Sequence, residues 1–254
     1  MSVLQRHWDA RAAANFIFGG AGSGLLVATA FVSSSRPIVV AVALALIAAG
    51  LGAVWLEIGR KLRAIHVFFN PFTSWMTRES FAAMLVFLLG GAFLLVGQKP
   101  LLYGAGVAAA AFLYCQARIL QAAKGIPAWR EPRIVPLIVW TGLAEGAGIA
   151  LVFSMASVSA ALFAGALMAR LLLWWRYREA VASAALVGAG RALLWLGTIL
   201  PLALLLVGDA FLWAAPLAGV AGLAAGAWLK LALVTRASWK QDFSLPHLPV
   251  RGGR

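Results

Sequence analysis

The stretch PIVVAVALALIAAGLGAVWL, residues 37–56, contains no charged residue. An α-helix rises about 1.5 Å per residue, so about 20 residues cross the ~30 Å hydrocarbon layer of a bilayer. A run of this length and character therefore predicts a transmembrane helix. It decides the fold class, because most of the remaining chain repeats the same pattern.

Seven further stretches are similarly apolar, and each has the length of a membrane span, about 18–23 residues. They cover residues 12–33, 80–97, 101–122, 134–155, 157–175, 192–210 and 216–234. We predict an all-α membrane protein with eight transmembrane helices, arranged as two four-helix bundles. Residues 1–254 then form a single integral membrane domain, with helices 1–4 over 12–122, helices 5–8 over 134–234 and a cytoplasmic C-terminal tail over 235–254.

The cationic residues fall almost entirely on one side of the predicted helices. An even number of spans places both termini on the same face, together with the second, fourth and sixth loops. Of the 21 Lys and Arg residues, only Arg36 and Lys99 fall on the opposite face. Positively charged loops stay in the cytoplasm, so we predict a multi-pass protein of the inner (cytoplasmic) membrane with both termini cytoplasmic. In so apolar a chain, the net charge of +13 indicates contact with membrane lipid and an acidic protein partner, and no nucleic acid.

Ligand counting argues against a bound redox metal. A haem in a membrane bundle needs histidine ligands within helices, but His7, His66 and His247 all lie outside the predicted spans. A single cysteine, Cys115, cannot hold an iron–sulfur cluster or a zinc ion by itself. We predict no haem, no iron–sulfur cluster and no metal site in this chain, and no catalytic residue for a substrate.

Five charged residues lie inside the predicted spans, where each is costly unless it is paired or hydrated: Arg118, Glu145, Arg170, Asp209 and Lys230. Glu145 lies near the centre of the fifth span, and Arg170 and Lys230 lie towards the cytoplasmic ends of the sixth and eighth. Two interpretations of the cations stay open, because long basic side chains either reach out to the interface or form buried contacts.

Glycine is concentrated in the first span. Gly19, Gly20, Gly22 and Gly24 allow another helix to approach closely, or they leave a slot for a flat ligand beside Asn15. The segment GAGSGLLVA (residues 20–28) also resembles GAGIALVFS (residues 146–154), about half the chain away. An internal duplication is therefore one open interpretation of the eight spans.

The loops on the cationic face carry motifs of a known family. Residues 57–79 read EIGRKLRAIHVFFNPFTSWMTRE, and Arg118 is followed by Ile126-Pro127-x-Trp129. The first run resembles the second-loop signature of the NrfD/DMSO-reductase-anchor (DmsC-like) family, in which HLG-x-P-x-RA leads to an asparagine and then to S-x-x-[SR/SN]-E. The second is similar to that family's R-x-Y … [VI]-P-x-W, and FGGAGSG (residues 18–24) is similar to its first helix.

The resemblance implies a cofactor-free subunit that exchanges electrons between membrane quinone (ubiquinone or menaquinone) and an iron–sulfur, ferredoxin-like subunit. That partner would serve a molybdopterin or tungstopterin catalytic subunit on the cytoplasmic side. The chain looks most like the anchor of phenylacetyl-CoA:acceptor oxidoreductase-type complexes, since a cytoplasmic loop face suits a cytoplasmic substrate. It departs from the family pattern where Glu57 replaces a histidine and Leu120 replaces a tyrosine.

These observations place a quinone site and a docking surface at the cytoplasmic ends of helices one to four. For the quinone and its proton route we predict Trp8, Asn15, Gly19, Gly20, Glu57, His66, Glu79, Arg118 and Trp129. For docking of the iron–sulfur subunit we predict Arg60, Lys61, Arg63, Arg78, Arg130 and Arg133.

Two other functions are compatible with the sequence. An ion-coupled secondary transporter would use the possible repeat and the central Glu145. A purely structural tether would have the same spans and no quinone site. The gathering of polar residues on one side of the membrane favours the quinone-reactive anchor.

Overall fold

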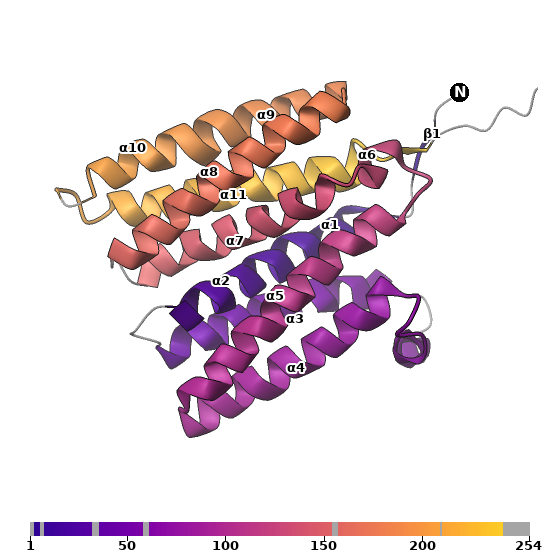
Figure 1. Ribbon diagram of the computed structural model, residues 1–254, viewed down its shortest axis with the longest axis horizontal. Coiled ribbons are helices and arrows are strands. Elements are labelled where there is room, and N and C mark those ends of the chain that lie inside the picture. Colours follow the sequence, from indigo (N-terminus) through magenta and orange to yellow (C-terminus); the bar gives the residue numbers. More distant parts are fainter. Residues whose placement is uncertain are drawn as a thin grey trace, which may run out of the picture.

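The chain folds almost entirely into long helices that lie alongside one another (Figure 1). A computed structural model describes residues 3–5, 8–31, 36–57, 61–153, 157–208 and 210–240. Within these residues, seven helices are long and apolar enough to cross a membrane. They are Ala10–Ala30, Pro37–Leu56, Trp75–Val96, Lys99–Ala122, Ile134–Phe153, Ala184–Leu206 and Ala214–Thr235. The predicted class, an all-α membrane protein, is confirmed.

The first half of the chain comprises β1 (Val3–Leu4), α1 (Ala10–Ala14), the π-helical segment η1 (Asn15–Gly19), α2 (Gly20–Phe31), α3 (Pro37–Glu57), the 3₁₀ helix η2 (Lys61–Phe69), α4 (Trp75–Val96) and α5 (Lys99–Ala122). The second half comprises α6 (Pro127–Arg130), α7 (Ile134–Phe153), α8 (Ser157–Ala180), η3 (Ala184–Leu186), α9 (Val187–Leu194), the π-helical segment η4 (Trp195–Ile199), α10 (Leu200–Leu206), α11 (Ala214–Thr235) and β2 (Trp239–Lys240). Figure 1 shows α1–α5 together in the lower part of the molecule and α7–α11 in the upper part.

The two groups of helices meet where α2 packs against α7. Glycines form this junction: a Cβ on Gly146 would lie 2.5 Å from Cα of Gly24, and a Cβ on Gly142 would lie 3.0 Å from the carbonyl oxygen of Gly20. The backbones therefore touch, as small residues permit in membrane helices. The glycines of the first span are expected either to let another helix approach or to leave a slot for a ligand. Gly24 does the first, because it packs directly against α7. Gly24 and Gly146 come from the two similar segments, whose common origin stays a prediction.

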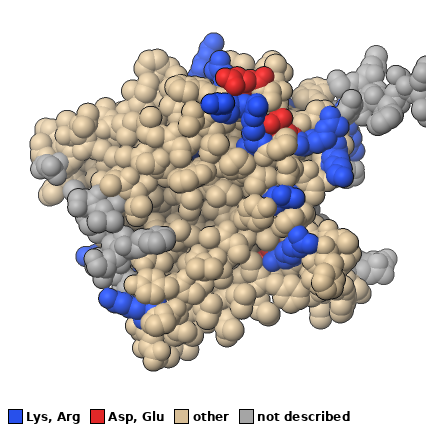
Figure 2. Space-filling view, in the orientation of Figure 1, with Lys and Arg blue, Asp and Glu red and all other residues tan. Residues whose placement is uncertain are grey.

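Charged side chains gather at one end of the molecule. In Figure 2, Lys and Arg cluster on the right, at the end where α6, β1 and η2 lie in Figure 1, and few appear on the left. At the charged end, β1 pairs antiparallel with β2, and Gln5 ties this pair to the helices. The Gln5 Nε2 donates to Ser238 Oγ (3.1 Å) and to the Trp8 carbonyl (2.9 Å). The segment before the first span is thereby fixed against the segment after the last.

Candidate functional site

A cavity of about 810 Å³ opens near the charged end, between α1, η1, α3, η2 and the first turns of α4. Its walls comprise Trp8, Ala12, Asn15, Phe16, Leu51, Gly52, Val54, Trp55, Ile65, Val67, Phe68, Met76, Glu79, Ser80 and Ile119. Trp55, Ile65, Phe68 and Met76 are exposed at its mouth. An apolar cavity of this size, with few polar groups, is typical of a small-molecule site.

Glu79 is the carboxylate of this cavity, and it is 5% exposed. It lies one turn into α4, whose start is fixed by Ser74, the Oγ of which accepts the Thr77 N–H. The side-chain amide of Asn15 donates to Glu79 Oε1 at 3.3 Å. Thr77 Oγ1 donates to the carbonyl of Val67, which anchors η2 over the cavity. The structure thus brings together two predicted site residues, Asn15 and Glu79, from helices far apart in the sequence.

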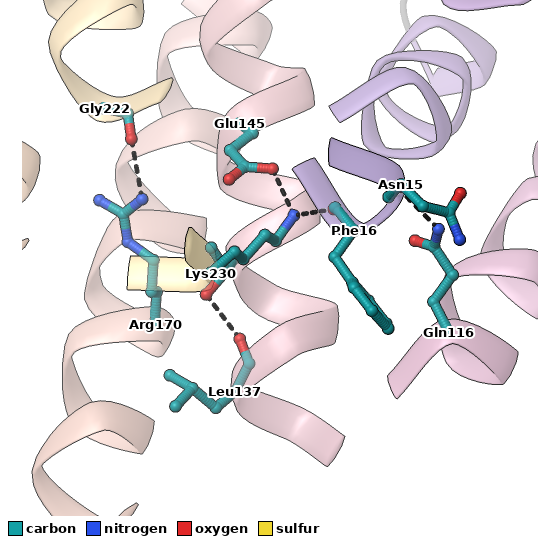
Figure 3. Close-up of polar contacts among 9 residues, drawn as sticks. Asn15, Phe16, Gln116, Leu137, Glu145, Arg170, Gly222 and Lys230 are labelled. Carbon is teal, nitrogen blue, oxygen red and sulfur yellow. Dashed lines mark hydrogen bonds and ion pairs between the residues drawn. The ribbon is translucent and has the colours of Figure 1, made fainter. Parts of the chain in front are cut away.

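Asn15 begins the π-helical segment η1, which departs from the α-helical ladder. Carbonyls of this segment accept side-chain donors from two other helices: Gln116 Nε2 donates to Asn15 O at 3.0 Å, and Lys230 Nζ donates to Phe16 O at 2.8 Å (Figure 3). π-Bulges of this kind often mark functional positions in helices. The bulge therefore links the wall of the cavity to the interior of the protein.

Gly19 and Gly20 do not line the cavity. A Cβ on Gly19 would lie 2.5 Å from Gln116 Nε2, and one on Gly20 would overlap Lys230 Nζ. The absent side chains make room for the two donors that reach η1, and so these glycines provide no slot for a flat ligand. Gly226 likewise makes room for Glu145, the ion-pair partner of Lys230, because a Cβ on Gly226 would lie 2.6 Å from Glu145 Oε1.

Lys230 and Glu145 form an ion pair of 2.6 Å inside the protein, and neither side chain is exposed (Figure 3). Arg170 is also fully buried, and its guanidinium donates to Gly222 O (2.9 Å) and to Gly197 O in the second π-helical segment, η4. The interpretation that these cations reach out to the interface is therefore wrong. Backbone carbonyls and one carboxylate accept hydrogen bonds from them, as buried charge in a membrane requires, although Arg170 Nε has no partner among the described residues.

Two aromatic residues of the predicted site adjoin the cavity. Trp8 lines it and lies 4.9 Å from the ring of Trp129. Trp129 is completely buried behind it, and its Nε1 donates to Leu233 O at 2.9 Å. Asp9, which follows Trp8, caps the start of α1. A side-chain hydrogen bond from Arg11 lowers the pKa of the Asp9 carboxyl below its ordinary value.

Three other predicted residues do not contribute described side chains to the cavity. Arg118 lies over the ring of Trp75 at 4.5 Å and donates to Tyr114 Oη, outside the cavity walls. His66 is exposed on η2 beside Phe69. Glu57 ends α3, and its side chain lies outside the described residues.

Half of the predicted docking residues are described. Arg78 donates to the carbonyls of Pro71 and Phe72 and holds the loop before α4, while Arg133 donates to Arg176 O at 2.8 Å. Arg130 is exposed at the end of α6. Arg60 and the side chains of Lys61 and Arg63 lie outside the described residues.

Sequence reasoning missed Gln116 and Gln5. Gln116 is completely buried and holds η1, and Gln5 positions Trp8, whose N–H donates to Gln5 Oε1 at 2.7 Å. A signal existed for Gln116, since an amide inside an otherwise apolar span needs a polar partner. No comparable signal marks Gln5, because its partners Val234 and Ser238 come from the far end of the chain.

No protein-family model matches the chain, and no curated protein matches it significantly. The resemblance to the NrfD/DMSO-reductase-anchor family rests on the short loop motifs and stays a prediction. Among the described residues, no three His, Cys, Asp or Glu side chains lie close enough to share a metal ion.

Proposed function

We propose that this chain is the quinone-reactive membrane anchor of a molybdenum or tungsten iron–sulfur oxidoreductase. The observation that carries the proposal is the apolar cavity at the charged end, which holds one buried carboxylate, Glu79, beside an amide, Asn15. The motifs in residues 57–79 support the choice of partner, an iron–sulfur subunit docked on the cationic face. The chain would carry electrons between that subunit and quinone, in the manner of a phenylacetyl-CoA:quinone oxidoreductase anchor.

A quinone needs an apolar slot, a hydrogen-bond donor at a carbonyl and a route for protons. The exposed mouth formed by Trp55, Phe68 and Met76 suits a ligand that arrives from lipid. Asn15 Nδ2 offers the donor, and Glu79 accepts a proton when the quinol is oxidised or supplies one when the quinone is reduced. The cavity volume lies in the range of about 300–1,000 Å³ that is usual for ligand pockets.

The topology of the proposed anchor needs an eighth span, and we assign it to α8. This helix has 24 residues and packs against α7, and its one cation in mid-helix, Arg170, donates to two backbone carbonyls inside the protein. Eight spans then form two four-helix bundles and place both termini on the cationic face. That face is cytoplasmic under the positive-inside rule.

Filling the cavity tests the proposal directly. Nothing lies within 4 Å of a Cβ at Gly52, which lines the cavity, or at Gly91, which does not. Purified Gly52→Phe protein should therefore retain neither decylubiquinone nor menaquinone-4, while wild type and Gly91→Phe should retain one of them, as measured by chromatography of extracted quinone. Retention by Gly52→Phe at the wild-type level would show that the cavity is not the site. Absence of quinone from wild type would contradict the proposal and leave the transporter and the structural tether as the alternatives.

An ion-coupled transporter is the second candidate, and the buried group of Glu145, Lys230 and Arg170 favours it. Charges in the interior of a bundle commonly mark ion pathways. We prefer the anchor because Glu145 and Lys230 are enclosed, whereas Glu79 lines an open cavity. Proteoliposomes containing the chain alone should show no proton flux above that of empty liposomes. A flux that Glu145→Gln abolishes would favour the transporter.

A further inference from the structure

A second cavity, of about 400 Å³, lies between the end of α8 and the start of the following span. Trp174, Trp175, Arg178, Val187, Arg191 and Leu194 are among the residues of its wall. None of these residues lines the larger cavity, and the proposed electron transfer uses none of them. Two guanidinium groups therefore share a small space that has no assigned role.

Neither guanidinium has an anionic partner in the described part of the chain. The ion pairs there join Arg11 to Asp9, Arg133 to Glu131 and Lys230 to Glu145. Arg178 and Arg191 are both exposed. By contrast, the buried Arg170 donates hydrogen bonds to two backbone carbonyls. These two arginines need an external anion or water.

The position of Arg191 selects the kind of anion. It belongs to the apolar span Ala184–Leu206, roughly two turns or ~10 Å from the start of that helix. The face of the span beyond it is apolar and open, with Trp195 60% and Leu196 56% exposed. This surface faces lipid, so the anion nearest to Arg191 is a phospholipid headgroup. Arginine side chains near the ends of spans reach towards that layer.

The walls of the cavity match the rest of a phospholipid. Trp174 forms a buried side of it, and Gly190 is required there, because a Cβ at that position would lie 2.5 Å from Trp174 Cζ2. Trp175 is exposed, as tryptophans at the level of the headgroups often are. Val187 and Leu194, one on each side of Arg191 along the helix, offer an apolar track for an acyl chain.

We propose that this cavity binds the phosphodiester of an anionic phospholipid between Arg178 and Arg191. Basic pockets between membrane helices on the cytoplasmic side recognise such headgroups. The lipid would fill the gap between α8 and α9 and neutralise two cations that the protein leaves unpaired. The site is independent of the proposed quinone cavity, and so either assignment can fail without the other.

The test measures lipid retained by delipidated, purified protein in native mass spectrometry. Wild type should retain one phosphatidylglycerol and no phosphatidylcholine of the same acyl chains. The Arg178→Gln/Arg191→Gln variant should bind phosphatidylglycerol about 30-fold more weakly, because two basic contacts of on the order of 1 kcal/mol each are lost and 1.4 kcal/mol corresponds to a factor of ten. The matched control, Lys124→Gln/Arg176→Gln, removes two exposed cations that do not line this cavity, and should bind as wild type does.

Equal retention of the two lipids by wild type, or undiminished retention of phosphatidylglycerol by the double variant, would overturn the proposal. Displacement of the lipid by millimolar inorganic phosphate would also overturn it, because the site would then bind a soluble anion. If the double variant does not fold, the single variants Arg178→Gln and Arg191→Gln replace it. Each should lower retention of phosphatidylglycerol, and wild-type retention by both would equally exclude the site.

Discussion

Lys230 Nζ lies 2.6 Å from Oε2 of Glu145, and both side chains are completely buried. The same ammonium group donates to Phe16 O, so one side chain on α11 holds α7 and the π-helical segment of the first span together. Phe16 lines the larger cavity, and its neighbour Asn15 contacts Glu79 there. A buried ion pair and the proposed ligand site are thus joined through a single turn of helix.

Breaking this ion pair should destabilise the protein strongly. Lys230→Met leaves Glu145 as an unpaired buried acid, a loss of about 3–5 kcal/mol for pairs in soluble proteins. Thermal unfolding in detergent should occur at a clearly lower temperature than for wild type, and Lys230→Met/Glu145→Gln should recover part of the loss. Lys124→Met, at an exposed loop position, is the control and should unfold as wild type does. A stable Lys230→Met protein would contradict the pairing.

The junction of the two helix groups should tolerate no side chain at Gly146. A Cβ there would overlap the backbone of Gly24 and Leu25, and backbone cannot move aside cheaply. Gly146→Ala should therefore lower the unfolding temperature, whereas Gly165→Ala, which meets open space in the same half of the molecule, should leave it unchanged or slightly raised. Equal behaviour of the two variants would show that α2 and α7 do not approach this closely.

Glu79→Gln should abolish electron transfer to quinone in the assembled complex. Loss of a positioned proton acceptor typically lowers a rate by about 100-fold or more. A dye-linked assay of the catalytic subunit should stay at the wild-type level, because it bypasses the anchor. Glu179→Gln, an exposed acid outside both cavities, is the matched control. Wild-type quinone reduction by Glu79→Gln would remove Glu79 from the proton route.

The Arg118→Leu variant tests whether Arg118 only packs against its neighbours or also acts in the proposed quinone site. Its guanidinium contacts Trp75 and Tyr114 and does not line the cavity, so retention of quinone should persist in this variant. Electron transfer to quinone should therefore also stay at the wild-type level, whereas a direct contact between Arg118 and the quinone, as the sequence predicts, would make the variant lose this electron transfer. Measuring retained quinone and its reduction in the same preparation decides between the two expectations.

The orientation of the chain is tested by reporters. A reporter that is active only in the periplasm, fused after Arg254, should be inactive, because cationic loops stay in the cytoplasm. The same reporter inserted in the connection between α4 and α5 should be active, since that turn lies at the opposite end of the helices (Figure 1). Activity of the C-terminal fusion would invert the topology and would remove the cytoplasmic partner from the proposal.

The purified chain should contain no redox metal. With Cys115 as the one cysteine and no histidine inside a span, it should show no Soret band and no stoichiometric iron. Iron at one equivalent or more per chain would refute this prediction.

The sequence alone determined the membrane class and the approximate positions of seven spans. The predicted span 157–175 falls in α8, which is not among those seven, and the predicted span 192–210 begins at Ala184. Hydropathy is a property of consecutive residues, so residues 37–56 predict a membrane helix without information from any other part of the chain. Charge asymmetry is also local, since each loop contributes its own cations. Burial of Glu145 could be anticipated on the same basis, because it lies in apolar surroundings along the chain. Burial of Glu79 could not, because Glu79 follows Thr77 and Arg78 and precedes the predicted span 80–97.

Only the tertiary structure decided which polar residues meet. Successive residues on a helix point about 100° apart, so a small change in rotation decides whether a side chain faces a neighbouring helix or lipid. Arg118 and Gln116 are two residues apart on α5, yet Gln116 reaches Asn15 in the interior while Arg118 lies against Trp75. The pairs Asn15–Glu79 and Glu145–Lys230 likewise join residues 64 and 85 positions apart. Their contact depends on the packing of whole helices, which no local pattern specifies.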